Sequence, residues 1–333
     1  MQQPATPKSI QSLSLEAPSG FGVDILDHGA TLRAIRVPTS GGMISVLLSY
    51  PVIEDYARDL FYVGATVGRY ANRIRDARIQ IRGRRCVLDA NEKATGHCLH
   101  GGTNGFHAQQ WAMEKSAGGR VVECRHRSED GDQGFPGCVD VSVKYRLLTD
   151  YSLSIDFTVK AYADTVVSLA NHAYFNLDRN HRTIDTHDLK LQADYYTPAD
   201  ETGIPTGEIR SVTGTRFDFR DTAPLSLPKN CDSRSNQFDN NFVLRDANGK
   251  LFDAAELYSP DSGIRMRLRT TQPGLQLYTG DHLREPFVPR QGLCLEAQNY
   301  PNSPNQPEFP SASLAAGETY RQQTVYEFIP PTG

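Results

Sequence analysis

Alternation of apolar and polar residues with a period of two restricts the fold of this chain more than any other feature. The clearest case is the pair of segments 139–146 and 153–160, in which every second residue is Val, Tyr, Leu, Ile or Phe. A short polar turn at Thr149-Asp150 separates them, so the pattern predicts a β-hairpin with one buried face. A second hairpin is predicted around 260–263 (PDSG), because proline presets φ and glycine accepts positive φ.

Helical periodicity is nearly absent, and only segment 54–60 predicts a short helix. Many short antiparallel strands without βαβ spacing predict an all-β fold, a large sandwich or a barrel. The 333 residues allow one or two domains, but no linker-like stretch interrupts the middle of the chain. We therefore expect a single domain over residues 1–333, with residues 1–15 loosely held and residues 222–235 forming a long loop.

Composition excludes several classes of function. The net charge of −4 argues against a nucleic-acid partner, and no run approaches the roughly 18 apolar residues of a membrane span. The first residues lack the basic and apolar regions of a secretory signal. The six cysteines have no CxxC pair and no zinc-like spacing, so we expect reduced thiols and a cytoplasmic protein.

The segment 292–304 (GLCLEAQNYPNSP) places one carboxylate, Glu296, near the end of an otherwise apolar strand. The Pro- and Asn-rich run that follows cannot continue a strand, so Glu296 is expected at a sheet rim, where ligands bind. The segment 171–177 (NHAYFNL) offers His172 in similar surroundings, with Tyr174 on the same face. An isolated histidine of this kind is usually structural, but a carboxylate and a histidine that face one cleft would suit proton transfer.

Histidines at positions 97 and 100 (HCLH) lie three residues apart, which raises the question of a metal site. Ligand histidines at that spacing usually lie on a helix, and the neighbouring glycines break one here. No metal is expected. The segment 99–106 (LHGGTNGF) instead predicts a tight glycine loop that presents His100 to a ligand, and its spacing matches no nucleotide-binding motif.

Three further polar residues are candidates, although each has a simple structural explanation. Asp239 in QFDNNF suits a turn, Arg73 in ANRI suits a solvated surface, and Gln276 in GLQLYTG suits an exposed strand position. Arg73, next to Asn72, would also be able to donate paired hydrogen bonds to adjacent hydroxyls.

These motifs occur together, in one order, over most of the chain. VGRYANRI, LHGGTNGF, NHAYFNL, DYYTPADETGIPTGEIRSVTGTRFDFR, FDNNFVL, GLQLYTGDHL and CLEAQNYPNSPN closely resemble the aldose 1-epimerases, the galactose mutarotase family. The resemblance runs from about residue 61 to the segment 314–328. It implies a single large antiparallel β-sandwich of the galactose mutarotase type, with an open sugar cleft.

The resemblance also implies the activity and the roles of individual residues. The family interconverts the α and β anomers of free hexoses without a metal or a redox cofactor. Glu296 matches the general base and His172 the general acid. The positions that match substrate contacts are Arg73, His100, Asp239 and Gln276, with Asn72 and Tyr174 adjoining them. On the charges alone, we expect the carboxylates of Glu296 and Asp239 to keep His172 protonated.

Three other functions are compatible with parts of this pattern. A sugar-binding module of the same fold would leave the acid–base pair without a purpose. An enzyme for hexose 6-phosphates would need a cluster of Arg or Lys at the cleft, and the motifs offer none beyond Arg73. Glycoside hydrolysis usually needs two carboxylates flanking the bond. The expected partner is thus a free monosaccharide, whose identity the sequence leaves open, and the expected assembly is a monomer or a homodimer.

Overall fold

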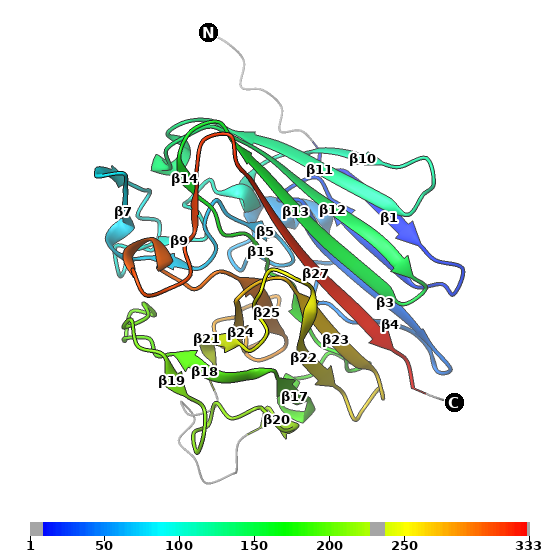
Figure 1. The fold of residues 1–333 in the computed structure, drawn as a ribbon. Coiled ribbons are helices and arrows are strands. Elements are labelled where there is room, and N and C mark those ends of the chain that lie inside the picture. Colours follow the sequence, from blue (N-terminus) through cyan, green and yellow to red (C-terminus); the bar gives the residue numbers. More distant parts are fainter. Residues whose placement is uncertain (1–8, 227–236, 332–333) are drawn as a thin grey trace.

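The structure, a computed structural model, describes residues 9–226 and 237–331 and is almost entirely β. Its largest element is a nine-stranded antiparallel sheet, seen in Figure 1 as the long strands that run side by side. In spatial order its strands are β10 (Ala112–Lys115), β11 (Val121–Ser128), β12 (Val139–Thr149), β13 (Ser152–Ala161), β27 (Thr319–Ile329), β23 (Arg265–Thr270), β22 (Phe252–Tyr258), β17 (Asp188–Leu191) and β20 (Ala223–Pro224).

The two predicted hairpins are confirmed. Strands β12 and β13 pair in antiparallel register, with Asp140 opposite Lys160 and Tyr145 opposite Ile155. The polar turn around residue 261 joins β22 to β23. In β12 buried and more exposed residues alternate along the strand, because successive side chains point to opposite faces of a sheet. The valines of the hairpin therefore line the core, and its charged residues face solvent.

Two smaller sheets and four two-stranded ladders complete the described part of the fold. A four-stranded sheet contains β1 (Ser12–Glu16), β2 (Gly22–Leu26), β3 (Thr31–Thr39) and β4 (Gly42–Ser45). A six-stranded sheet has the order β16 (Tyr174–Phe175), β25 (Leu293–Gln298), β24 (Gly274–Tyr278), β21 (Asp239–Leu244), β18 (Ala193–Thr197) and β19 (Arg210–Ser211). One hydrophobic core takes residues from all three sheets, which makes the predicted all-β sandwich correct.

Three local expectations have mixed outcomes. The predicted short helix is present as a 3₁₀ helix, η1 (Ile53–Arg58). The expected loose segment 1–15 is wrong for residues 12–15, because β1 pairs with β2 along its length; residues 1–8 lie outside the described residues. Most of the predicted loop 222–235 also lies outside them. None of the described helices is long and apolar enough to cross a membrane.

Short two-stranded ladders carry the segments that surround the candidate site. Strand β5 (Thr66–Val67) pairs with β15 (Ala170–Asn171), and β6 (Arg73–Ile74) pairs with β9 (Cys98–Leu99). Each ladder ends immediately before a site histidine, at residues 172 and 100 respectively. The sandwich thereby brings together two loops that are far apart in the sequence.

A buried arginine holds this region to the large sheet. Arg69 is 2% exposed, and its guanidinium donates to the Ser128 hydroxyl at 2.6 Å, the Gly137 carbonyl at 2.6 Å and the Thr165 hydroxyl at 3.1 Å. Burial lowers the pKa of Arg69 to about 10, which leaves it charged at neutral pH. Its side chain therefore satisfies several buried acceptors, two of them hydroxyls and one a backbone carbonyl.

Replacing Arg69 with methionine keeps an apolar stem of similar length but leaves these acceptors without a donor. We expect Arg69→Met to lower the free energy of unfolding by about 3 kcal/mol or more, because each unsatisfied buried group costs on the order of 1–3 kcal/mol. Urea unfolding followed by fluorescence measures the difference. The control is Arg321→Met at an exposed position, and equal stabilities of the two variants would contradict this account.

Candidate active site

Glu296 lies within β25 and is 2% exposed. On one side it stands opposite Gln276 of β24, whereas the short strand β16 pairs only with Leu293 and Cys294. The expected position at a sheet rim is thus only partly correct, because Glu296 lies inside its strand, although β16 does not extend far enough to pair with it. Its Oε2 atom is buried and has no hydrogen-bond partner among the described residues.

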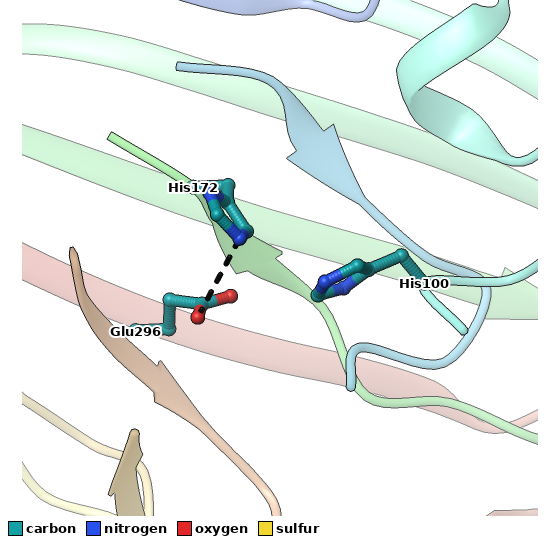
Figure 2. Close-up of side chains that lie close together, drawn as sticks. All are labelled: His100, His172 and Glu296. Carbon is teal, nitrogen blue, oxygen red and sulfur yellow. Dashed lines mark ion pairs between the residues drawn. The ribbon is translucent and has the colours of Figure 1, made fainter. Parts of the chain in front are cut away.

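His172 faces Glu296 from the connection between β15 and β16. Its backbone N–H donates to the Ala65 carbonyl at 2.9 Å and its carbonyl accepts from the Gly64 N–H at 3.0 Å, which fixes the peptide on both sides. The imidazole Nε2 lies 3.8 Å from Glu296 Oε1 (Figure 2). That separation is too long for a hydrogen bond, so the two groups face each other without a direct bond.

His100 enters from the glycine loop and points toward the same pair (Figure 2). The Asn72 backbone N–H donates to His100 Nδ1 at 3.2 Å, and the His100 N–H donates to the Asn72 carbonyl at 2.9 Å. Because Nδ1 accepts a hydrogen bond, the ring proton must be on Nε2, the atom available to the cleft. His100 is therefore a neutral hydrogen-bond donor.

The ring nitrogens of His100 and His172 and a carboxylate oxygen of Glu296 lie within 4.8 Å of one another, a spacing that a metal ion would also accept. The hydrogen bonds do not suit one. A metal would bind through the lone pair of His100 Nε2. That nitrogen carries the ring proton, because Nδ1 accepts the hydrogen bond from the Asn72 N–H. His97, the other histidine of HCLH, is remote from this group and contacts the Thr202 hydroxyl at 3.0 Å through Nε2. The donor set therefore fits proton transfer better than metal binding.

Arg73 and Asp239 form the polar wall of the cleft. Arg73 Nη1 lies 3.4 Å from Asp239 Oδ2, and Gln276 Nε2 donates to Asp239 Oδ1 at 2.6 Å. A second carboxylate, Glu92, accepts from Arg73 Nε at 3.0 Å and from Nη2 at 2.9 Å. Sequence reasoning missed Glu92, because a lone glutamate in a polar turn carries no signal of its partner.

These side chains surround a cavity of about 220 Å³. All eight residues singled out from the sequence line it except Gln276, which reaches it through Asp239. Several aromatic residues that sequence reasoning missed complete the wall, among them Tyr62, whose ring centroid lies 4.6 Å from that of His100. A larger hollow of about 440 Å³ lies over β11 to β13, but charges that pair with one another, such as Arg127 with Asp140, line it.

Burial dominates the electrostatics of the central pair. Burial raises the pKa of Glu296 well above its ordinary value; the charge of Asp239 adds to this and that of Arg73 opposes it. Burial lowers the pKa of His172 to about 4, although Asp239 opposes the shift. The expectation that neighbouring carboxylates keep His172 protonated is therefore wrong, because desolvation outweighs their attraction. Burial therefore favours the neutral forms of both groups, the carboxylic acid of Glu296 and the neutral imidazole of His172.

The fold and the site together define a class of protein. It is an antiparallel β-supersandwich with a buried histidine–glutamate pair in an open cleft. The family model described as aldose 1-epimerase matches residues 11–327. The chain is 36% identical to the aldose 1-epimerase of Escherichia coli (strain K12) over 330 residues, 95% of this chain and 94% of the relative. It is 37% identical to the galactose mutarotase of Homo sapiens over 317 residues, 92% and 90% of the two chains.

Solved structures of aldose epimerases have the same fold. The GalM/aldose epimerase homologue from C. elegans superimposes with a TM-score of 0.89 at 29% identity and covers 97% of this chain and 100% of its own. Galactose 1-epimerase from Lactobacillus acidophilus gives 0.86 at 27% identity, with coverages of 99% and 98%. The chain belongs to the aldose 1-epimerase family.

The loop that positions His100 depends on Gly101. This residue has φ +86°, and a Cβ there would collide with the Gly68 carbonyl oxygen. We expect Gly101→Ala to lower the free energy of unfolding by roughly 2 kcal/mol or more, because overpacking adds to the cost of a positive φ. Gly96→Ala is the matched control, since Gly96 has φ +75° but no atom within 4 Å of the added Cβ. Equal losses in urea unfolding would show that the contact with Gly68 is unimportant.

The lowered pKa of His172 predicts a pH dependence of stability. Between about pH 6.5 and pH 4, His172 binds a proton in the unfolded chain but not in the native protein. The free energy of unfolding therefore falls as the pH falls through this window. The wild type should therefore lose up to about 3 kcal/mol more than His172→Asn over that range. Urea unfolding at several pH values measures this difference, and parallel pH profiles would refute the burial of a neutral imidazole.

Proposed function

We propose that this protein is an aldose 1-epimerase, an isomerase that interconverts the α and β anomers of free aldohexoses such as glucose and galactose. The observation that carries the proposal is the pair formed by His172 and Glu296, whose facing atoms lie 3.8 Å apart in the cleft. One group that gives a proton and one that takes a proton are what ring opening requires. The names of the relatives, aldose 1-epimerase and galactose mutarotase, support the choice of reaction.

Ring opening moves two protons in opposite directions. The step starts with one proton moved from Glu296 to His172: Glu296, as carboxylate, takes the proton of the C1 hydroxyl, and His172, as imidazolium, gives its proton to the ring oxygen O5 as the C1–O5 bond breaks. The products are an open-chain aldehyde, a neutral imidazole and a carboxylic acid. Rotation about C1–C2 then presents the other face of the aldehyde, and the ring closes with the two residues in exchanged roles. Each positioned group contributes on the order of 10²–10⁴ in rate.

Burial of the pair favours one stage of this cycle. The raised pKa of Glu296 and the lowered pKa of His172 both stabilise the neutral pair, which is the proton distribution that accompanies the aldehyde. Burial therefore favours the protonation states that accompany the aldehyde over the charged states from which ring opening starts. No metal or redox cofactor takes part in this scheme, since protons alone are exchanged.

The remaining site residues are proposed to hold the sugar hydroxyls. His100 donates from Nε2, Arg73 donates through its free N–H groups, and Asp239 accepts. Gln276 orients Asp239 through its 2.6 Å hydrogen bond. The Tyr174 hydroxyl donates to the Phe61 carbonyl at 3.0 Å, so Tyr174 is proposed to contact the sugar with the face of its ring. Asn72 acts mainly by holding His100.

The charges of the cleft favour a neutral substrate over a hexose 6-phosphate. Among the described residues that line the cavity, Arg73 is the one arginine or lysine, and the carboxylates of Glu92 and Asp239 accompany it together with the buried carboxyl group of Glu296. Excess negative charge repels a phosphate. A binding module without turnover is also less consistent with the site, because simple hydroxyl recognition does not call for a buried carboxyl that lacks a partner.

We further propose a single domain over residues 1–333 that works in the cytoplasm as a monomer or a homodimer, without nucleic acid or membrane. The core shared by the three sheets supports one domain, and a site built from one chain needs no second subunit. The five described cysteines, all free, suit a reducing compartment. The net charge of −4 suits a partner other than nucleic acid.

Removal of either member of the pair tests the activity. We expect Glu296→Gln and His172→Asn to lower the enzymatic rate of mutarotation by about 10²–10⁴-fold while the protein stays folded, because each variant loses one proton-transfer group. Polarimetry of freshly dissolved α-glucose and α-galactose, corrected for the spontaneous rate, measures the loss. Glu256→Gln, at a carboxylate that pairs with Arg265 and Arg267 on β23, is the control and should keep full activity.

Near-normal rates in either site variant would refute the assigned roles. A wild-type protein that does not exceed the spontaneous rate on either sugar would refute the activity itself and favour a binding module.

A further inference from the structure

Glu92 occupies one particular edge of the Arg73 guanidinium. Glu92 Oε1 accepts from Nε at 3.0 Å and from Nη2 at 2.9 Å, and Oε2 lies 3.2 Å from Nε. The Nε–Nη2 edge presents two parallel N–H groups, and this fork is the geometry with which arginine binds carboxylate and phosphate. In this chain a protein carboxylate already fills the fork.

The hydrogen bonds of Arg73 to protein carboxylates leave two of its N–H groups without an acceptor among the described residues. A guanidinium has five N–H groups. Glu92 takes the one on Nε and one on Nη2, and Asp239 takes one on Nη1 at 3.4 Å. One N–H on each Nη atom remains without an acceptor among the described residues. Two adjacent donors on a charge-compensated group suit two neighbouring hydroxyls.

The local turn holds Glu92 in this position. The Glu92 N–H donates to the His97 carbonyl at 3.2 Å, which closes the turn 92–97, and the Thr95 hydroxyl donates to Glu92 Oε2 at 2.6 Å. On the other side, Gly203 packs so closely on Arg73 that a Cβ there would lie 2.9 Å from Nη1. Both partners of the ion pair are largely buried, with side-chain exposures of 17% for Arg73 and 19% for Glu92.

We infer that Glu92 is a specificity-determining residue: it occupies the anion-binding edge of Arg73 and thereby restricts the cleft to neutral sugars. The inference rests on the proposed function for the identity of the normal substrate. Independently of turnover, the cleft contains a latent phosphate site that the Glu92 side chain covers.

The electrostatics support this role. Burial acts to raise the pKa of Glu92, but the hydrogen bonds and the charge of Arg73 outweigh it and hold the pKa below its ordinary value. Glu92 is therefore ionised at neutral pH, and a phosphate that approached Arg73 would meet its negative charge as well as that of Asp239. Removing Glu92 takes away one of these charges and opens the fork at the same time.

Calorimetric titration with inorganic phosphate tests the inference without any need for activity. We expect the wild type to show no binding at millimolar phosphate, and Glu92→Ala to bind at least about tenfold more tightly, because a free guanidinium fork gains charge-assisted hydrogen bonds. Adding Arg73→Met to Glu92→Ala should abolish the binding. Glu256→Gln is the matched control, since it removes a carboxylate from two arginines outside the cleft and should leave phosphate binding unchanged.

Glu92→Gln keeps the length of the side chain and provides a second test if the alanine variant fails to fold. With this variant the ratio of the rate on glucose 6-phosphate to the rate on glucose should rise several-fold over that of the wild type, since one repelling charge is lost. A folded Glu92→Ala that binds phosphate no better than the wild type would overturn the inference, as would binding that survives the loss of Arg73. A wild type without mutarotation would refute the proposed function, yet the phosphate titration would still decide the role of Glu92.

Discussion

The burial of the facing pair of His172 and Glu296 is the condition on which the site depends. Both side chains are almost fully buried, and burial moves their pKa values in opposite directions, each shift toward the neutral form of the group. A solvated pair would be an imidazole beside a carboxylate with little tendency to share a proton. In the buried cleft, by contrast, the neutral forms that the proposed ring opening produces are favoured over the charged forms from which it starts.

Hydrogen bonds of the backbone hold the two histidines of this arrangement in place. The peptide of His172 is bonded on both sides to residues 64 and 65, and His100 is bonded to Asn72 through its backbone and its ring. Close approaches that only glycine permits bring the His100 loop against residue 68. The same contacts fix the His100 tautomer, so a constellation with metal-like spacing presents an N–H where a metal would need a lone pair.

The wall of the cleft contains one cation whose charge neighbouring carboxylates compensate. Arg73 lies between Glu92 and Asp239, and both carboxylates help to keep it charged despite its burial. A compensated guanidinium keeps its hydrogen-bond donors while it loses its attraction for anions. A single arginine can thus serve hydroxyl recognition in a cavity whose centre is a proton-transfer pair. The proposed preference for free sugars and the proposed role of Glu92 follow from this one arrangement.

The sequence by itself determined the all-β architecture, the hairpin of β12 and β13, and the membership of His172, Glu296, Arg73 and His100 in one site. Period-two alternation is a local property, and the ordered motifs belong to a family. What needed the tertiary structure was the state of those residues. The neutral form of His172 follows from burial by segments distant in sequence, where charge counting predicted the opposite. The Nε2–H tautomer of His100 and the pairing of Glu92 with Arg73 likewise arise from contacts between separate segments, which no local pattern encodes.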